Sequence, residues 1–100
     1  MGLLATLACG DEGLNCLQII GQVNNKGEPH GVAKMISTDG YFIYEGQFVN
    51  WKMQGYGRFI GNGYYYIGEW KDDKYHGQGS YVFSNGTIKK GTFINGGFDK

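Results

Sequence analysis

The chain has 100 residues, with nine basic and nine acidic side chains and a formal net charge of zero. This length allows one small domain, and the balanced charge argues against a basic nucleic-acid surface or attraction to an anionic membrane. Glycine occurs 19 times, aromatic residues make up 16% and proline occurs once. This composition is typical of a β-rich protein with many tight turns and excludes neither of the wider function classes, scaffold or enzyme.

Residues 1–16 precede the repeating part of the chain and are expected to form an N-terminal extension. Its apolar stretch LLATLA has room for a short helical segment packed on the rest of the protein. The opening MGLLAT also matches the N-myristoylation pattern at Gly2 and Thr6, and Cys9 could carry a second lipid chain. Two lipid chains would anchor the protein stably to a membrane, whereas one lipid chain would not. Both interpretations stay open.

The remaining N-terminal features favour a cytoplasmic location. Cys9 and Cys16 are too few for a disulfide scaffold, so we expect a reducing compartment. The stretch LLATLA lacks a preceding basic residue and is a poor secretory signal. No segment of the chain approaches the roughly 20 apolar residues that a membrane span needs.

A repeat of about 23 residues organises the rest of the chain. The pattern aromatic-x-Gly-x-aromatic occurs as YEGQF and YIGEW and, degraded, as KKGTF, with central glycines at Gly46, Gly68 and Gly91. A weaker copy, IIGQV, surrounds Gly21. We therefore assign residues 17–100 to the repeats, with units at about 19–40, 44–63, 66–86 and a half unit at 89–97.

Within each unit the apolar residues alternate with period two, which predicts strands. Asn62-Gly63 and Asn85-Gly86 are strong signals for tight hairpin turns. The predicted strands lie near 17–23, 31–37, 41–48, 55–61, 64–70, 77–84 and 87–94, joined inside the repeats by longer polar loops at 24–30, 49–54 and 71–76. The predicted fold class is all-β, a single-layer antiparallel meander of β-hairpins.

Glycine and aromatic residues share one face of these strands for a physical reason. An aromatic ring on one strand needs room over its neighbour, and a strand glycine supplies that room because it has no side chain. Glycine weakens a strand entropically, so ring packing between adjacent repeats must compensate. A single hairpin would therefore not fold alone, and stacking of the repeats supplies the stability.

These residues resemble a known family. The stretches YEGQFVNWKMQGYGRFIGNG and YIGEWKDDKYHGQGSYVFSNG are similar to MORN repeats, whose pattern runs Y-x-G-x-W, a polar loop, H-G-x-G, an aromatic residue and a turn glycine. The resemblance spans residues 19–95 and implies a solenoid of β-hairpins that binds proteins and, in some members, is linked to membranes or dimerises. It implies no catalytic activity. Lys89 departs from the pattern, because Tyr44 and Tyr66 stand at its position in the other units. On the inward face of a last strand it would cap the repeats, or it would contact an acidic partner.

The sequence shows no catalytic constellation. The runs GYGRFIG and HGQG continue into strand patterns, whereas a nucleotide-binding glycine loop must lead into a helix. His30 and His76 occupy equivalent repeat positions without a third metal ligand nearby, so we expect a structural use. Asp72 and Asp73 are expected in a solvated loop. We predict no catalytic residue, no metal and no cofactor.

The aromatic stripe is the predicted partner-binding site, because exposed Tyr and Trp dominate protein interfaces. The alternative is that these rings pack only on one another, or that inner rings are structural and rim rings bind. The predicted contact residues are Tyr44, Phe48, Trp51, Phe59, Tyr66, Trp70, Tyr81 and Phe83.

The resulting functional hypothesis is a non-enzymatic structural or adaptor subunit that binds protein partners in a larger assembly. The resemblance places such an assembly in the cytoskeleton or cilium, including the axoneme. Association of copies of the chain through edge strands is also open, and nucleic-acid binding is not expected. The alternatives are a peripheral membrane module, through acylation of Gly2 or phospholipid contacts of Lys89 and Lys90, and a regulatory module of a larger enzyme.

Overall fold

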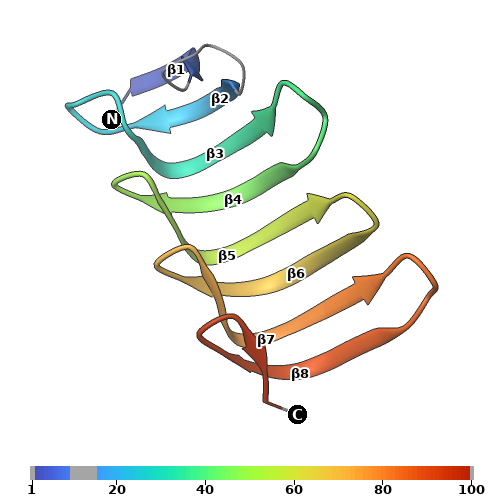
Figure 1. Ribbon diagram of the computed structural model, residues 1–100. Coiled ribbons are helices and arrows are strands. Elements are labelled where there is room, and N and C mark those ends of the chain that lie inside the picture. The colour runs from blue at the N-terminus through green and yellow to red at the C-terminus, as the bar shows by residue number, and fades with distance from the viewer. Residues whose placement is uncertain (1, 10–15, 100) are drawn as a thin grey trace.

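The structure is a computed structural model that describes residues 2–9 and 16–99, with only the backbone described for residues 2–9. It is one nine-stranded sheet in which every strand pairs antiparallel with its sequence neighbour (Figure 1). No helix occurs in the described residues. The strands are β1 (Gly2–Cys9), β2 (Cys16–Val23), β3 (Pro29–Ser37), β4 (Ile43–Val49), β5 (Lys52–Gly61), β6 (Tyr64–Lys71), β7 (Lys74–Phe83), β8 (Ile88–Ile94) and β9 (Gly97–Phe98). The predicted all-β, single-layer meander is confirmed.

The N-terminal segment is a strand, so the helical segment considered for it is wrong. β1 pairs with β2 from Gly2↔Val23 to Cys9↔Cys16. Without this pairing β2 would expose a row of unpaired backbone N–H and C=O groups, and that cost favours the strand over a local helix. Cys16 is disulfide-bonded, so the expectation of reduced cysteines is wrong, and the cysteines no longer support a reducing compartment.

Two predicted polar loops are tight turns instead. Asn50-Trp51 and Asp72-Asp73 join their strands directly, and all four residues have positive φ, between 46° and 78°. Positive φ at both central residues matches the right-handed twist of the flanking strands. The strands therefore extend beyond the predicted limits. The strand that follows each turn has a register shift, which lies opposite Gly46–Phe48 of β4 in one hairpin and opposite Gly68–Trp70 of β6 in the other.

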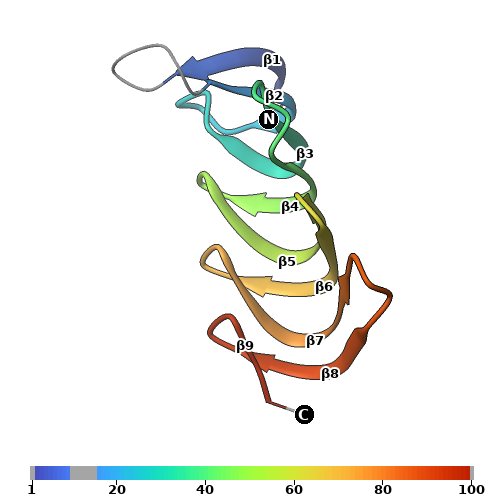
Figure 2. The same ribbon diagram turned by 45° about the vertical axis from the view of Figure 1, so that its right-hand side comes forward.

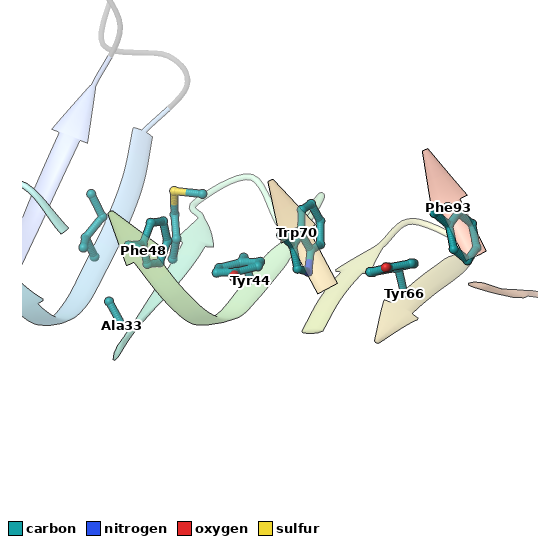
Figure 3. Packing of buried hydrophobic residues seen from close by; sticks show 8 residues of the cluster. Ala33, Tyr44, Phe48, Tyr66, Trp70 and Phe93 are labelled. Carbon is teal, nitrogen blue, oxygen red and sulfur yellow. The ribbon is translucent and has the colours of Figure 1, made fainter. Parts of the chain in front are cut away.

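The strands bend along their length, so the sheet is strongly curved (Figure 2). We call the face that carries the core the inner face and the opposite one the outer face. The inner face holds a continuous row of buried side chains across the repeats, and Figure 3 shows most of it. Its buried members are Ile19, Ala33, Met35, Tyr44, Phe48, Tyr66, Trp70 and Phe93.

The predicted reason for the glycines is confirmed by the packing around Tyr66. A Cβ at Gly79 would lie 2.2 Å from the Tyr66 hydroxyl, and one at Gly68 would lie 2.8 Å from it. The ring thus occupies the space that two paired glycines leave, and its hydroxyl donates to the Glu69 carbonyl oxygen at 2.8 Å. Tyr44 repeats this arrangement in the preceding unit, where it lies against Gly57.

We expect Gly79→Ala to lower the free energy of unfolding by about 2–3 kcal/mol, because the new methyl group collides with a fully buried ring that cannot move. Urea denaturation followed by circular dichroism measures the loss. Gly97→Ala is the matched control, since its Cβ meets only the Ile94 carbonyl oxygen at 3.6 Å. Equal stability of the two variants would contradict this account of the repeat.

Candidate interaction surfaces

Four of the eight predicted contact residues lie in the core. Tyr44 and Tyr66 are 0% exposed, Phe48 is 1% and Trp70 is 5% exposed. Trp70 lies between the two tyrosines, with ring centroids 5.2 Å from Tyr44 and 5.3 Å from Tyr66 in edge-to-face geometry (Figure 3). Its Nε1 donates to the Gly57 carbonyl oxygen at 3.1 Å. These four side chains are occupied in joining one repeat to the next.

The other predicted contact residues are accessible. Trp51 is exposed in the turn between β4 and β5. Phe59, Tyr81 and Phe83 are half-buried and belong to a row of rings that continues from strand to strand along one border of the inner face. Successive ring centroids lie 4.8–5.9 Å apart. We call this row the rim ladder; it consists of Phe42, Phe59, Tyr64, Tyr81 and Phe83.

Sequence reasoning missed two members of the rim ladder. Phe42 and Tyr64 each precede a repeat tyrosine by two residues, and residues two apart on a strand point to the same face. That spacing could have identified both residues from the sequence. With them included, the rim ladder runs across the repeats without a gap, whereas the predicted set of rings had a gap at each hairpin.

Lys89 ends the rim ladder. Its Nζ lies 5.7 Å from the Phe83 ring centroid and 5.9 Å from that of Phe98, within the range of cation–π attraction. The residue is on the inner face as predicted, but β8 is not the last strand. β9 pairs with β8 at Phe93↔Phe98 and Ile94↔Gly97.

The two histidines hold turns in place. The Nδ1 atom of His30 accepts a hydrogen bond from the backbone N–H of Asn50 at 3.1 Å. His76 does the same for the N–H of Asn95 at 3.3 Å. In the repeat between them Gln54 holds the turn by another bond, from its Nε2 to the Asp72 carboxylate at 2.7 Å. Each turn is thus fixed to the preceding repeat, which confirms the predicted structural use of the histidines.

An acceptor side chain supports each register shift. Gln22, Gln47 and Glu69 occupy equivalent positions, and the Oε1 of each accepts a backbone N–H from the next strand at 2.7, 2.6 and 3.1 Å. The acceptor covers a glycine of positive φ, such as Gly77 beside Glu69. Only glycine adopts this conformation readily, and its missing Cβ leaves the space that the acceptor fills.

We expect Glu69→Leu to lower the free energy of unfolding by about 1 kcal/mol, because the Gln78 N–H loses its acceptor. Glu69→Gln keeps an acceptor oxygen, as Gln22 and Gln47 do in the other repeats, and should change stability by less than about 0.5 kcal/mol. Chemical denaturation of both variants measures the difference. A Gln variant as unstable as the Leu variant would show that the charge matters and not the hydrogen bond.

Burial perturbs the tyrosines of the core. Removal from water, with Glu69 nearby, raises the pKa of Tyr66 to about 12. Burial also raises the pKa of Tyr44 and of Tyr75 well above the usual value for tyrosine. These groups are therefore neutral hydrogen-bond donors and packing surfaces at neutral pH, and none is set up as an acid or base.

The raised pKa of Tyr66 predicts a loss of stability at high pH. The folded state keeps its proton above pH 10, where the unfolded chain loses it, so stability is full below about pH 10 and falls as the pH rises toward about 12. Denaturation at a series of pH values measures the fall. Tyr66→Phe should start from a lower stability, having lost the bond to Glu69, but fall less steeply. An unchanged slope would contradict the assignment.

Among the side chains of residues 16–99, no group of three or more His, Cys, Asp or Glu could hold a metal ion. In the same residues, no helix is long and apolar enough to cross a bilayer.

The geometry defines a class of protein: a solenoid of β-hairpins in which a tyrosine lies over paired glycines and a tryptophan or phenylalanine joins successive units. The model of the MORN repeat matches the chain at residues 25–40, 44–63 and 66–88. The chain therefore belongs to the MORN repeat family, and the resemblance found in its sequence is confirmed. MORN repeats are generally non-catalytic modules of protein or membrane interaction.

Three curated relatives carry similar segments within far longer chains. Alsin of Rattus norvegicus is 34% identical over 73 residues, which are 67% of this chain and 4% of alsin. Alsin of Homo sapiens matches to the same extent. The inactive protein tyrosine kinase pTKL of Plasmodium falciparum is 40% identical over 60 residues, or 59% of this chain and 4% of that protein. The chain thus spans only a small fraction of the length of these relatives.

Proposed function

We propose that the chain is a non-enzymatic structural or adaptor module that binds protein partners within a larger assembly. The observation that carries the proposal is the division of its aromatic residues. The central rings are buried between repeats, while the rim ladder and Trp51 remain accessible. A partner can therefore bind aromatic surface without disturbing the packing that holds the repeats together.

The rim ladder suits an extended or helical protein segment. It runs across several strands, so a partner lying along it would contact consecutive repeats and bury several rings at once. Lys89 at its end would pair with an acidic group of that partner. We further propose a cytoplasmic assembly of the cytoskeleton or cilium, including the axoneme, a setting suggested by family association alone.

The test is native isolation of the tagged chain from cells that express it, with cross-linking and intact mass measurement. We expect stoichiometric protein partners for the unmodified chain and at least a fivefold lower recovery with Phe83→Ala, a loss of about 1 kcal/mol of binding. Tyr41→Ala is the matched control, because Tyr41 is 62% exposed and lies outside the rim ladder. Equal recovery with both variants would refute docking on the rim ladder, and the absence of any stoichiometric partner would refute the adaptor role.

A peripheral membrane module is the second candidate, and the myristoylation pattern at Gly2 favours it. The intact mass measured in the same isolation decides it. A mass increased by a myristoyl group, with recovery in the membrane fraction, would promote this candidate over the adaptor. The third candidate is a regulatory module of a larger enzyme, and it draws support from relatives that carry such repeats in much longer chains.

A further inference from the structure

The outer face carries exposed apolar side chains that neither the fold nor the rim ladder uses. On the described strands, every exposed large apolar side chain lies on this face, and the most exposed are Ile88 at 61%, Val32 at 60% and Tyr56 at 58%. An exposed apolar area of this kind on an antiparallel sheet, whose second face is ordinarily polar, indicates an interaction site.

The register arranges apolar residues of this face in a line. Six residues are successive pairing partners across β3 to β8: Ile36, Ile43, Ile60, Tyr65, Val82 and Ile88. We call this line the outer ladder. With strands about 4.8 Å apart, its five steps span about 24 Å along the long axis of the sheet.

A hollow opens beside the outer ladder toward its C-terminal end. It has a volume of about 560 Å³ and is lined by Tyr65, Ile67, Ser80, Val82, Ile88 and Lys90, among others. The one carboxylate in the described lining, that of Glu69, already accepts the Gln78 N–H. The hollow exists because Ser80 is small. Its equivalents in the two preceding repeats, Lys34 and Arg58, have long side chains, and Ser80 leaves room for a side chain of a partner.

The charges of that row favour an acidic occupant. The row contains Lys34, Arg58 and Lys90 against a single carboxylate, Glu45. The Oε2 atom of Glu45 lies 3.8 Å from the Lys34 Nζ, and its Oε1 accepts a hydrogen bond from the Arg58 guanidinium. Lys90, at the hollow, has no ion pair in the described part of the chain. An acidic group of a partner would complete the row.

We infer that the outer ladder and its hollow bind an acidic amphipathic helix of a protein partner. A helix fits better than an extended segment, because the backbone groups of the sheet already pair within its plane and offer nothing to a strand lying on the face. A helix satisfies its own backbone and presents apolar residues at i, i+3, i+4 and i+7. About 16 residues of helix match the 24 Å of the outer ladder.

This site is additional to the rim ladder, which lies on the opposite face. The inference shares one premise with the proposed adaptor function, namely that the molecule bound is a protein. A chain that binds one partner on each face would join them through a single layer of sheet.

The test is selection of helical peptides by the intact chain, from a library of about 18-residue sequences with randomised surface positions. We expect acidic amphipathic helices whose binding, followed by backbone NMR shifts, maps to β5–β8 residues of the outer face. Ser80→Gln, which fills the hollow, should weaken binding about tenfold. Lys90→Glu should weaken it about fivefold at low salt and less at high salt.

The matched controls are Ser84→Gln, the same change in an exposed turn, and Lys74→Glu, the same charge reversal away from the hollow. Both should bind the peptides like the unmodified chain. Selected peptides that map to the rim ladder, or that bind Ser80→Gln at full strength, would overturn the inference and leave the adaptor function standing. Two other results would also overturn the inference. One is self-association of the chain, seen by sedimentation, that covers the hollow. The other is binding of phosphatidylcholine–phosphatidylserine vesicles at the hollow.

Discussion

The structure depends on one contact, the tyrosine ring that lies over two paired glycines. In the sheet, Gly57 faces Gly46 and Gly79 faces Gly68, so each pair leaves a site where no side chain stands. Tyr44 and Tyr66 fill those sites, and their hydroxyls bond to carbonyl oxygens three residues ahead at 2.9 and 2.8 Å. The ring is thereby buried completely within a single layer of sheet, without a second layer to cover it. Trp70 can then pack between two such rings and join one unit to the next.

This arrangement separates the tasks of the two faces. Stability comes from the inner face, where the rings of successive units contact one another edge to face. The outer face contributes little to that packing, so its side chains are free to vary with the partner. Some polar residues of the outer face stabilise the fold, since Gln22, Gln47 and Glu69 accept backbone hydrogen bonds at the register shifts. Apolar residues of that face such as Tyr56 and Ile88 make no comparable contact.

Much of the fold was predictable, because the spacing of Gly46, Gly68 and Gly91 reports the repeat directly. The strand β1 was not, since LLATLA has no alternating pattern and only the open edge of β2 explains its conformation. The Asn50-Trp51 turn was also missed, because a bulky residue with a φ of 78° is uncommon. Tyr44 and Trp70 could be identified as members of one stripe, but their burial depends on how far the sheet curves. The outer ladder escaped notice because Ile43 and Ile60 become neighbours only once the strand register is known.

The meander has a mechanical consequence. Every strand pairs only with the strand before and the strand after it, so the stack is held along its long axis by one hydrogen-bonded seam after another. Tension applied across the stack, from β1 toward β9, would load these seams in series and open them in turn, as a zipper opens, instead of shearing many bonds at once. Such a module would yield stepwise under load and reclose hairpin by hairpin, which makes it a compliant spacer between whatever its two ends are attached to.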